Sequence, residues 1–550
     1  MQDGNEKFSR FTLLAVVAVH LAIVLPLAYW LNIWVDEAST LYTTQSGFLH
    51  AFQHAWADEK QAPLYFWIMS LWRVLNDSFF FARLFSIICT AGGIFLVWKF
   101  ARCFLSGRAA AITAILFGLH PLVIWAALEA RGYALGFVLA ALLVHLNEAL
   151  IAQGENARTK PRIAFIATAI IALYTNYYLG FVLAGCFVAN VVSGRARNVV
   201  NFLASMIPVA IVFLPQALLV RSQFAINTQG FHEPVSLVEG LRLMWQHFVT
   251  MLLPAGLFPT GEWSPLAFAR IWIVRVLLIA VGIFTAVNLR AVSNRTWRLM
   301  ALAGTVFLGL LSAYFAVGSD LVELRHATVA FVPLLLAAVS LGFDLSAAVA
   351  SRPARLTFVA VGGVILAIFF QASIVGLYPT MTKRGDWDRV ARFLEASSEW
   401  RPIFVFPVYD TLALEQTYNG KVHISPGEGY FRFTRDAPAG SANSLLTETN
   451  FAISQFPTAT KEVWLVTGSV CSEKIAEKDR KMIQTLDPKI TDKPVVRCAS
   501  CDRMVDHYNT FLSSTNRPRN ICWQCLAREE KNFFARRGYS RSSRTGVIPR

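Results

Sequence analysis

Charged residues are scarce in this 550-residue chain, where only 15% are Asp, Glu, Lys or Arg, whereas soluble proteins carry about 25%. Glycine and proline, at 32 and 22 residues, are too few for a collagen-like or disordered chain. Eight cysteines in this length exclude a small secreted disulfide scaffold. Apolar residues are abundant instead, with 55% hydrophobic and 13% aromatic residues. The composition therefore predicts a polytopic α-helical membrane protein.

Long apolar runs predict the membrane spans. A helix needs about 20 apolar residues to cross a hydrocarbon core about 30 Å thick. Eleven runs meet or approach this length, and the two shortest are separated by a break near Asn176. The predicted spans are 11–33, 82–105, 109–128, 132–152, 163–176, 178–193, 199–220, 270–290, 299–318, 327–346 and 356–378.

Basic residues predict the orientation. They cluster ahead of the first span and after every even-numbered span, which puts all clusters on one side of the membrane. The clusters are Lys7 and Arg10; Arg102 and Arg108; Arg158, Lys160 and Arg162; Arg195 and Arg197; Arg290, Arg295 and Arg298; Arg352 and Arg355. Positive-inside bias makes that side cytoplasmic, and it accounts for the net charge of +15 without a nucleic-acid partner. The long segments 34–81 and 221–269 and the region from 379 are then exoplasmic.

Charged and polar side chains gather at the helix ends that face outward in this arrangement. The first outer loop opens with Asp36-Glu37, and Asp58-Glu59-Lys60 precedes an amphipathic helix predicted over 64–75 in the membrane interface. Later outer connections carry Glu129, Arg131 and Tyr133, then Asn176, then Glu323, Arg325 and His326. A single such charge also fits a solvated loop end. Several converging charges favour a polar cavity for a charged substrate, because charge at membrane depth needs a partner or water.

The order of these residues resembles the membrane glycosyltransferases of the C superfamily (GT-C). The pattern is closest to the family 39-like enzymes, which include protein O-mannosyltransferases and the lipid A aminoarabinose transferase. The resemblance covers roughly residues 10–400, and Ala62 departs from it where relatives often carry a second proline. The matching elements are Trp34-x-Asp36-Glu37, Pro63-Leu64-Tyr65, Arg83, Glu129-Ala130-Arg131-x-Tyr133, Arg325-His326 with Pro333, and Gly385-Asp386-Trp387-Asp388.

The resemblance implies sugar transfer from a polyprenyl-phosphate-linked donor to a lipid, glycan or protein acceptor on the exoplasmic face, with inversion. An acceptor hydroxyl needs a carboxylate base, for which Asp36 is the first candidate and Glu37 the second. Cations should hold the charge of the leaving phosphate. The candidates for that role are Lys60, Arg131 and Arg325, and the supporting cavity residues are Asp58, Glu59, Glu129, Tyr133, Asn176 and His326. Assistance by a divalent metal stays open.

The region after the last span predicts a small exoplasmic α/β domain over 379–490. An amphipathic helix is predicted over 387–398, and strands over 402–408 and 462–467. Because no glycine-rich nucleotide fingerprint accompanies these elements, the domain is assigned a structural or acceptor-positioning role.

Four cysteines define a further module over 491–527. Cys498, Cys501, Cys522 and Cys525 form a CxxC-x20-CxxC pattern, a spacing typical of a structural zinc site. Thiols on the outer face usually oxidise, so zinc and two disulfides are both open. The basic tail over 528–550 is predicted to be disordered, and without an aromatic stacking platform it does not indicate nucleic-acid binding.

Two other functions compete with glycosyl transfer by a catalytic membrane domain over 1–378. A transporter or flippase of a lipid-linked glycan would typically show internal repeats and broken helices meeting at the membrane midplane. Here the charges cluster at one face and no repeat is visible, which favours the enzyme. A non-catalytic scaffold is the third hypothesis. Family pattern and short basic loops predict a bacterial inner membrane, with a cytoplasmic N-terminus and a periplasmic C-terminal domain.

Overall fold

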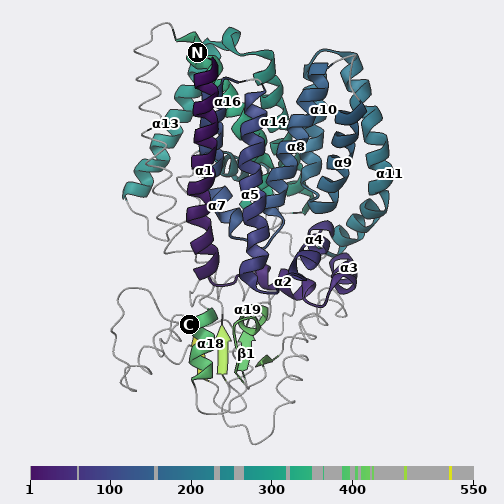
Figure 1. The fold of residues 1–550 in the computed structure, drawn as a ribbon, viewed down its shortest axis with the longest axis vertical. Helices are drawn as coiled ribbons and strands as arrows, with labels where there is room; N and C mark the ends of the chain where they lie inside the picture. Colours follow the sequence, from purple (N-terminus) through teal and green to yellow (C-terminus); the bar gives the residue numbers. More distant parts are fainter. Residues whose placement is uncertain are drawn as a thin grey trace, which may run out of the picture. The chain divides into compact units, whose positions relative to one another are not determined.

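In a computed structural model the described part of the chain is mostly helical and contains one small parallel sheet (Figure 1). It divides into two compact units, which are described separately: residues 1–31, 43–228 and 232–381, and residues 32–42, 229–231 and 382–550. The structure describes residues 2–57, 61–103, 105–153, 159–227, 236–252, 265–317, 322–349, 363, 387–396, 403–406, 411–420, 424–425, 464–467 and 519–522.

The first unit is built from long helices that run side by side in Figure 1. Its major helices are α1 (Gln2–Trp30), α5 (Phe79–Arg102), α6 (Gly107–Gly118), α7 (Pro121–Ala127), α8 (Tyr133–Gln153), α9 (Thr159–Thr175), α10 (Leu179–Val192), α11 (Ala196–Asn227), α12 (Leu237–Leu252), α13 (Pro265–Val287), α14 (Asn294–Val317), α15 (Leu324–Ala327) and α16 (Phe331–Ala348). Two shorter helices also belong to this unit, α3 (Phe48–Ala57) and α4 (Leu64–Arg73). Helix α2 (Val35–Thr44) has residues 35–42 in the second unit and Thr43 and Thr44 in the first.

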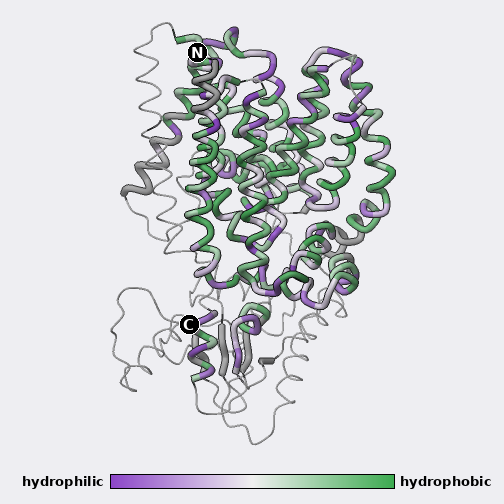
Figure 2. The backbone as a smooth tube through the Cα atoms, viewed as in Figure 1, coloured by the Kyte–Doolittle hydropathy of each residue, from purple (hydrophilic) through white to green (hydrophobic). Residues whose placement is uncertain are grey.

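Among the described residues, six helices are long and apolar enough to cross a membrane, or seven if the bent pair α6–α7 is one span. Figure 2 shows apolar residues along most of the length of these helices. The predicted count of eleven is not confirmed. Helix α9 has 17 residues and α10 has 14, and the predicted span 356–378 lies outside the described residues. Hydropathy alone cannot separate a full span from a shorter buried helix.

The break between α6 and α7 shows why hydropathy alone does not separate a full span from shorter buried helices. The apolar run 109–128 predicts one straight span, but the two helices meet at an angle of 57°. His120 accepts a hydrogen bond from the Leu122 amide at 3.1 Å, and Pro121 occupies the first position of α7. A side-chain cap followed by proline is the usual start of a new helix. The flanking residues are apolar because they are buried, so the run looks continuous.

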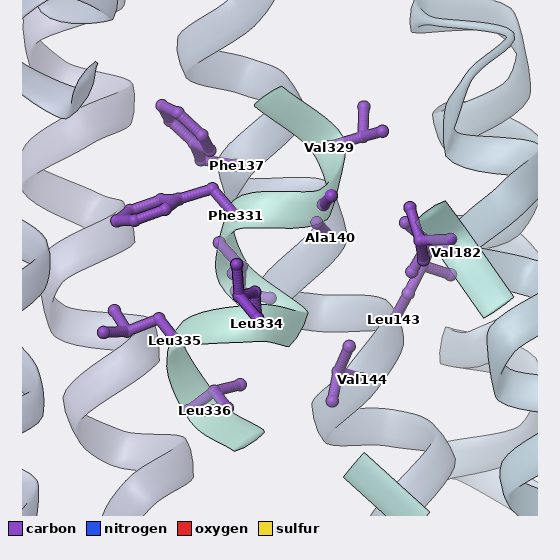
Figure 3. Close-up of a cluster of buried hydrophobic side chains, with 14 of the residues drawn as sticks. Phe137, Ala140, Leu143, Val144, Val182, Val329, Phe331, Leu334, Leu335 and Leu336 are labelled. Atoms are coloured by element: carbon purple, nitrogen blue, oxygen red, sulfur yellow. The ribbon is translucent and has the colours of Figure 1, made fainter. Parts of the chain in front are cut away.

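The core of the helical unit is apolar and rich in aromatic rings. Phe331 lies with its ring centroid 5.8 Å from that of Phe137 and 5.9 Å from that of Phe117. Figure 3 shows Phe137 on α8 beside Phe331 at the start of α16. An ion pair joins two of these helices, where Arg298 on α14 donates to both carboxylate oxygens of Glu148 on α8 at 3.2 and 2.7 Å. Such bidentate pairing fixes the relative orientation of the two side chains and also pairs their charges.

Helices α10 and α14 approach closely because glycine faces the contact. A Cβ atom added at Gly185 of α10 would lie 2.8 Å from the Leu302 carbonyl oxygen of α14. Replacing Gly185 with alanine is therefore expected to lower the free energy of unfolding by about 1–3 kcal/mol through overpacking. Thermal unfolding in detergent measures this. Gly304→Ala on α14 is the control, since a Cβ there meets no atom within 4 Å; equal stability of the two variants would contradict the prediction.

The second unit contains a four-stranded parallel sheet in the order β2-β1-β3-β4. Its strands and helices are β1 (Ile403–Phe406), β2 (Ile424–Ser425), β3 (Trp464–Thr467), β4 (Arg519–Cys522), α18 (Trp387–Glu395) and α19 (Thr411–Glu415). Strands β1 and β3 and helix α18 lie within the segments where the sequence predicts strands and a helix. Glu395 accepts a hydrogen bond from the Asn419 amide at 2.6 Å, which ties the end of α18 to the turn after α19.

Candidate functional site

The acidic pair stands in the first turn of α2, and its two carboxylates have different surroundings. Glu37 is only 1% exposed and accepts a hydrogen bond from the Trp34 amide at 3.1 Å. This is one half of a capping box, in which the third helical residue reaches back to the amide that precedes the helix. The Glu37 carboxylate therefore takes part in starting α2.

Asp36 is partly exposed. Its backbone carbonyl accepts a hydrogen bond from the Thr40 hydroxyl at 3.2 Å, one turn further along α2. Asp36 lies in the first turn of α2. A general base has to be within reach of the acceptor hydroxyl, so the partial exposure of Asp36 favours it over the buried Glu37 in that role.

The connection between α7 and α8 holds the next candidates. Glu129 and Arg131 are buried, with exposed fractions of 1% and 7%. Ser86 on α5 donates to the Glu129 carbonyl at 2.6 Å. The ring of Tyr133, the first residue of α8, lies 4.9 Å from that of Trp125.

Tyr65 joins α4 to this connection. A Cβ atom added at Gly132 would lie 3.5 Å from the Tyr65 side chain, so the ring packs directly on the backbone between Arg131 and Tyr133. Tyr65 is buried. The Pro63-Leu64-Tyr65 element and the Glu129–Tyr133 element, which are more than sixty residues apart in the sequence, thus meet in the fold.

A third group forms around Tyr178, in the turn between α9 and α10. Its ring stacks on His326 with centroids 5.6 Å apart, and the Arg325 guanidinium pairs with Glu323 at 2.9 Å. Burial raises the pKa of Tyr178 to about 12, while Arg325 lowers it and Tyr133 raises it. The stacking of Tyr178 on His326 brings the α9–α10 turn against α15. At neutral pH the Tyr178 hydroxyl is protonated and can donate to an anion.

Asn176 has a local role in this group. Its side-chain oxygen accepts a hydrogen bond from the Tyr178 amide at 2.9 Å, which closes the turn after α9. An asparagine in this arrangement shapes the backbone. Asn176 therefore orients Tyr178.

The other predicted site residues lie where the structure gives no side-chain geometry. Asp58, Glu59, Lys60, Cys498, Cys501 and Cys525 are outside the described residues, and the side chain of Cys522 in β4 is not described. Across the described ranges, no group of three or more His, Cys, Asp or Glu side chains is arranged to hold a metal ion. The zinc or disulfide module and the divalent metal remain predictions from the sequence.

Arg83 on α5 has a role that sequence reasoning did not assign. It is fully buried and donates to the carbonyl oxygens of Ala28 and Leu31 at 2.8 and 2.7 Å. These carbonyls lie at the C-terminal end of α1, where the last carbonyl oxygens of a helix have no hydrogen-bond partner within the helix. The signal in the sequence was a lone arginine in an apolar run, a position that normally requires a partner.

Comparison with known proteins adds structural relatives only. No family model matches the chain, and no curated protein matches it in sequence. The oligosaccharyltransferase AglB from Archaeoglobus fulgidus, in complex with an inhibitory peptide and a dolichol-phosphate, shows 13% identity and a TM-score of 0.41. That match covers 74% of this chain and 63% of AglB, so the chain spans less than two thirds of that protein.

ArnT from Cupriavidus metallidurans bound to undecaprenyl phosphate shows 14% identity and a TM-score of 0.34, over 77% of this chain and 88% of ArnT. Both likenesses concern the fold alone. Structural matches with TM-scores this low assign no function to the chain.

Proposed function

We propose that the protein is an integral membrane glycosyltransferase. It moves a sugar from a polyprenyl-phosphate-linked donor to a lipid, glycan or protein acceptor on the exoplasmic face of a bacterial inner membrane. The observation that carries this proposal is that the two carboxylates of the acidic pair differ in their contacts and exposure. Glu37 caps α2, whereas Asp36 is partly exposed beside it. A partly exposed carboxylate at the start of α2 can be reached by an acceptor hydroxyl, which a general base has to be.

Each proposed role matches the chemistry of one step. Asp36 takes the proton of the acceptor hydroxyl as its oxygen attacks the anomeric carbon of the sugar. The bond between that carbon and the phosphate oxygen breaks, and direct displacement inverts the configuration. Arg325 and Arg131, with Lys60, hold the negative charge that returns to the lipid phosphate. Tyr178, whose ring stacks on His326 next to Arg325 in the sequence, donates its hydroxyl proton in a hydrogen bond to the same anion.

Sugar transfer by the purified full-length chain in nanodiscs tests the proposal. The substrates are radiolabelled polyprenyl-phosphate sugars, supplied with lipid, glycan and peptide acceptors. Release of free polyprenyl phosphate together with a labelled acceptor supports the transferase. Donor that is bound by the protein and crosses the membrane of proteoliposomes with its sugar still attached would overturn it in favour of a flippase.

Arg325→Gln is expected to weaken the binding of the donor. Loss of a hydrogen bond to a charged group costs about 1.5–3 kcal/mol, so KM for the donor should rise about 10- to 100-fold. Initial rates at varied donor concentration measure this. Arg290→Gln, which changes an exposed arginine after α13, is the matched control and should leave KM unchanged. An unchanged KM in Arg325→Gln would remove Arg325 from the phosphate site.

A further inference from the structure

The C-terminal end of α2 is held by polar side chains from α3 and α4. His50 of α3 contacts the Thr43 carbonyl oxygen through Nδ1 at 3.2 Å, and His54 Nδ1 lies 3.4 Å from the Thr43 hydroxyl. The two imidazole rings stack with centroids 5.3 Å apart. A carbonyl oxygen can only accept, so His50 carries its proton on Nδ1. Thr43 is fully buried, and both contacts to it are partly buried.

Arg73, at the end of α4, adds a third contact. Its guanidinium donates to the Thr44 hydroxyl at 2.6 Å and also pairs with the Asp77 carboxylate. Arg73 is only 6% exposed, and Asp77 lies on the surface. Burial lowers the pKa of Arg73 and Asp77 raises it. A second amino group of Arg73 donates to the Asp77 carbonyl at 3.4 Å, which fixes the plane of the guanidinium. We call Thr43, Thr44, His50, His54 and Arg73 the α2 clamp.

We propose that the α2 clamp is a positioning device for the base at the other end of the helix. The inference rests on the proposed function, since it assigns Asp36 a reaction to perform. Asp36 stands seven residues before Thr43, which is about two helical turns and roughly 10 Å along the axis. At that distance a tilt of α2 by about 6° about its clamped end moves Asp36 by about 1 Å, and a shift of this size can cost a large factor in rate.

The contacts of the α2 clamp are directed hydrogen bonds, which suit a role in positioning α2 better than a role in stability alone. Apolar packing can hold a short helix to its neighbours, but it allows small rotations, whereas directed hydrogen bonds penalise them. Here three basic side chains from two helices converge on the last two residues of a ten-residue helix. The clamp thus restricts the direction of α2, and through the length of the helix it restricts Asp36.

The clamp can be loosened without changing its shape. Thr44→Val removes the hydroxyl that Arg73 contacts and keeps the branched side chain, whereas Thr44→Ser keeps the hydroxyl. Thr44→Val is expected to lower kcat about tenfold and to leave KM for the donor unchanged, because the donor phosphate binds elsewhere. Thr44→Ser should restore most of kcat. The control is Thr305→Val, which removes only a bond from the Thr305 hydroxyl to the Ala301 carbonyl within α14.

Hydrogen exchange of the same variants, followed by mass spectrometry, supplies a readout that needs no substrate. Amides of α2 should exchange about tenfold faster in Thr44→Val than in the wild type or Thr305→Val. Faster exchange together with lower kcat supports the inference, whereas unchanged exchange or unchanged kcat in Thr44→Val overturns it. If the wild type transfers no sugar from any donor, the proposed function fails and the role of the clamp in catalysis fails with it. The exchange data then still decide whether the clamp restrains α2.

Discussion

Replacing Asp36 with asparagine is expected to lower kcat for sugar transfer by about 10²–10⁴-fold, the usual contribution of a general base. Asparagine has the shape of aspartate but does not accept the proton at neutral pH. The helix should form as before, because the cap of α2 comes from Glu37 and the Trp34 amide. Donor binding should be retained. Transfer rates at saturating donor, together with donor binding by equilibrium dialysis, measure both effects.

Glu37→Gln is the matched variant. Its amide oxygen can still accept from the Trp34 amide, and glutamine is the other residue that occurs in capping boxes. Most of the activity is therefore expected to survive. If Glu37→Gln abolished transfer while Asp36→Asn did not, the two roles would be exchanged. If both variants kept wild-type rates, neither carboxylate would be the base.

Arg83→Met is expected to lower the free energy of unfolding by about 3–5 kcal/mol, because two hydrogen bonds from a charged donor are lost in a buried place. The carbonyls of Ala28 and Leu31 would lose this donor at the end of α1. The fifth residue after Leu31 is Asp36, so activity should fall as well. Thermal unfolding in detergent and exchange of the α1 amides measure the loss.

Arg83→Lys is the control for this prediction. A lysine ammonium can donate to the final carbonyls of a helix, as lysines near helix ends commonly do. It can also keep the cation beside the Phe79 ring, which lies 5.1 Å from the Arg83 guanidinium carbon. We expect a smaller loss of stability in Arg83→Lys than in Arg83→Met. Equal losses would show that the shape of arginine matters at this position and its charge does not.

The apolar runs of the sequence predicted most helix positions well. The structure places helices on ten of the eleven runs, because a segment that is buried in lipid or protein has to be both apolar and hydrogen-bonded within itself. The runs did not predict which helices are full spans. The break near Asn176 did mark the two shortest runs, whereas the 57° bend after α6 depends on a single cap, His120, within an otherwise apolar run.

The candidate site was likewise predicted from the sequence only in part. Asp36-Glu37 and Arg325-His326 stood out because charge is expensive at the end of an apolar run. Their adjacency could not separate Asp36 from Glu37, since that distinction depends on the position of the Trp34 amide. The α2 clamp left no pattern in the sequence, because Arg73 and Thr44 are 29 residues apart and are ordinary residues in their local context.

The sequence by itself determined that this is a membrane protein, where its helices lie, and which few charged residues have to be explained. Those properties follow from hydropathy, which each residue carries wherever it is placed. Tertiary structure alone decided that the Tyr178 ring stacks on His326, that Arg73 reaches Thr44, and that Arg83 holds the end of α1. Hydrogen bonds and ring contacts depend on distances of a few ångströms, and only the folded chain sets those distances.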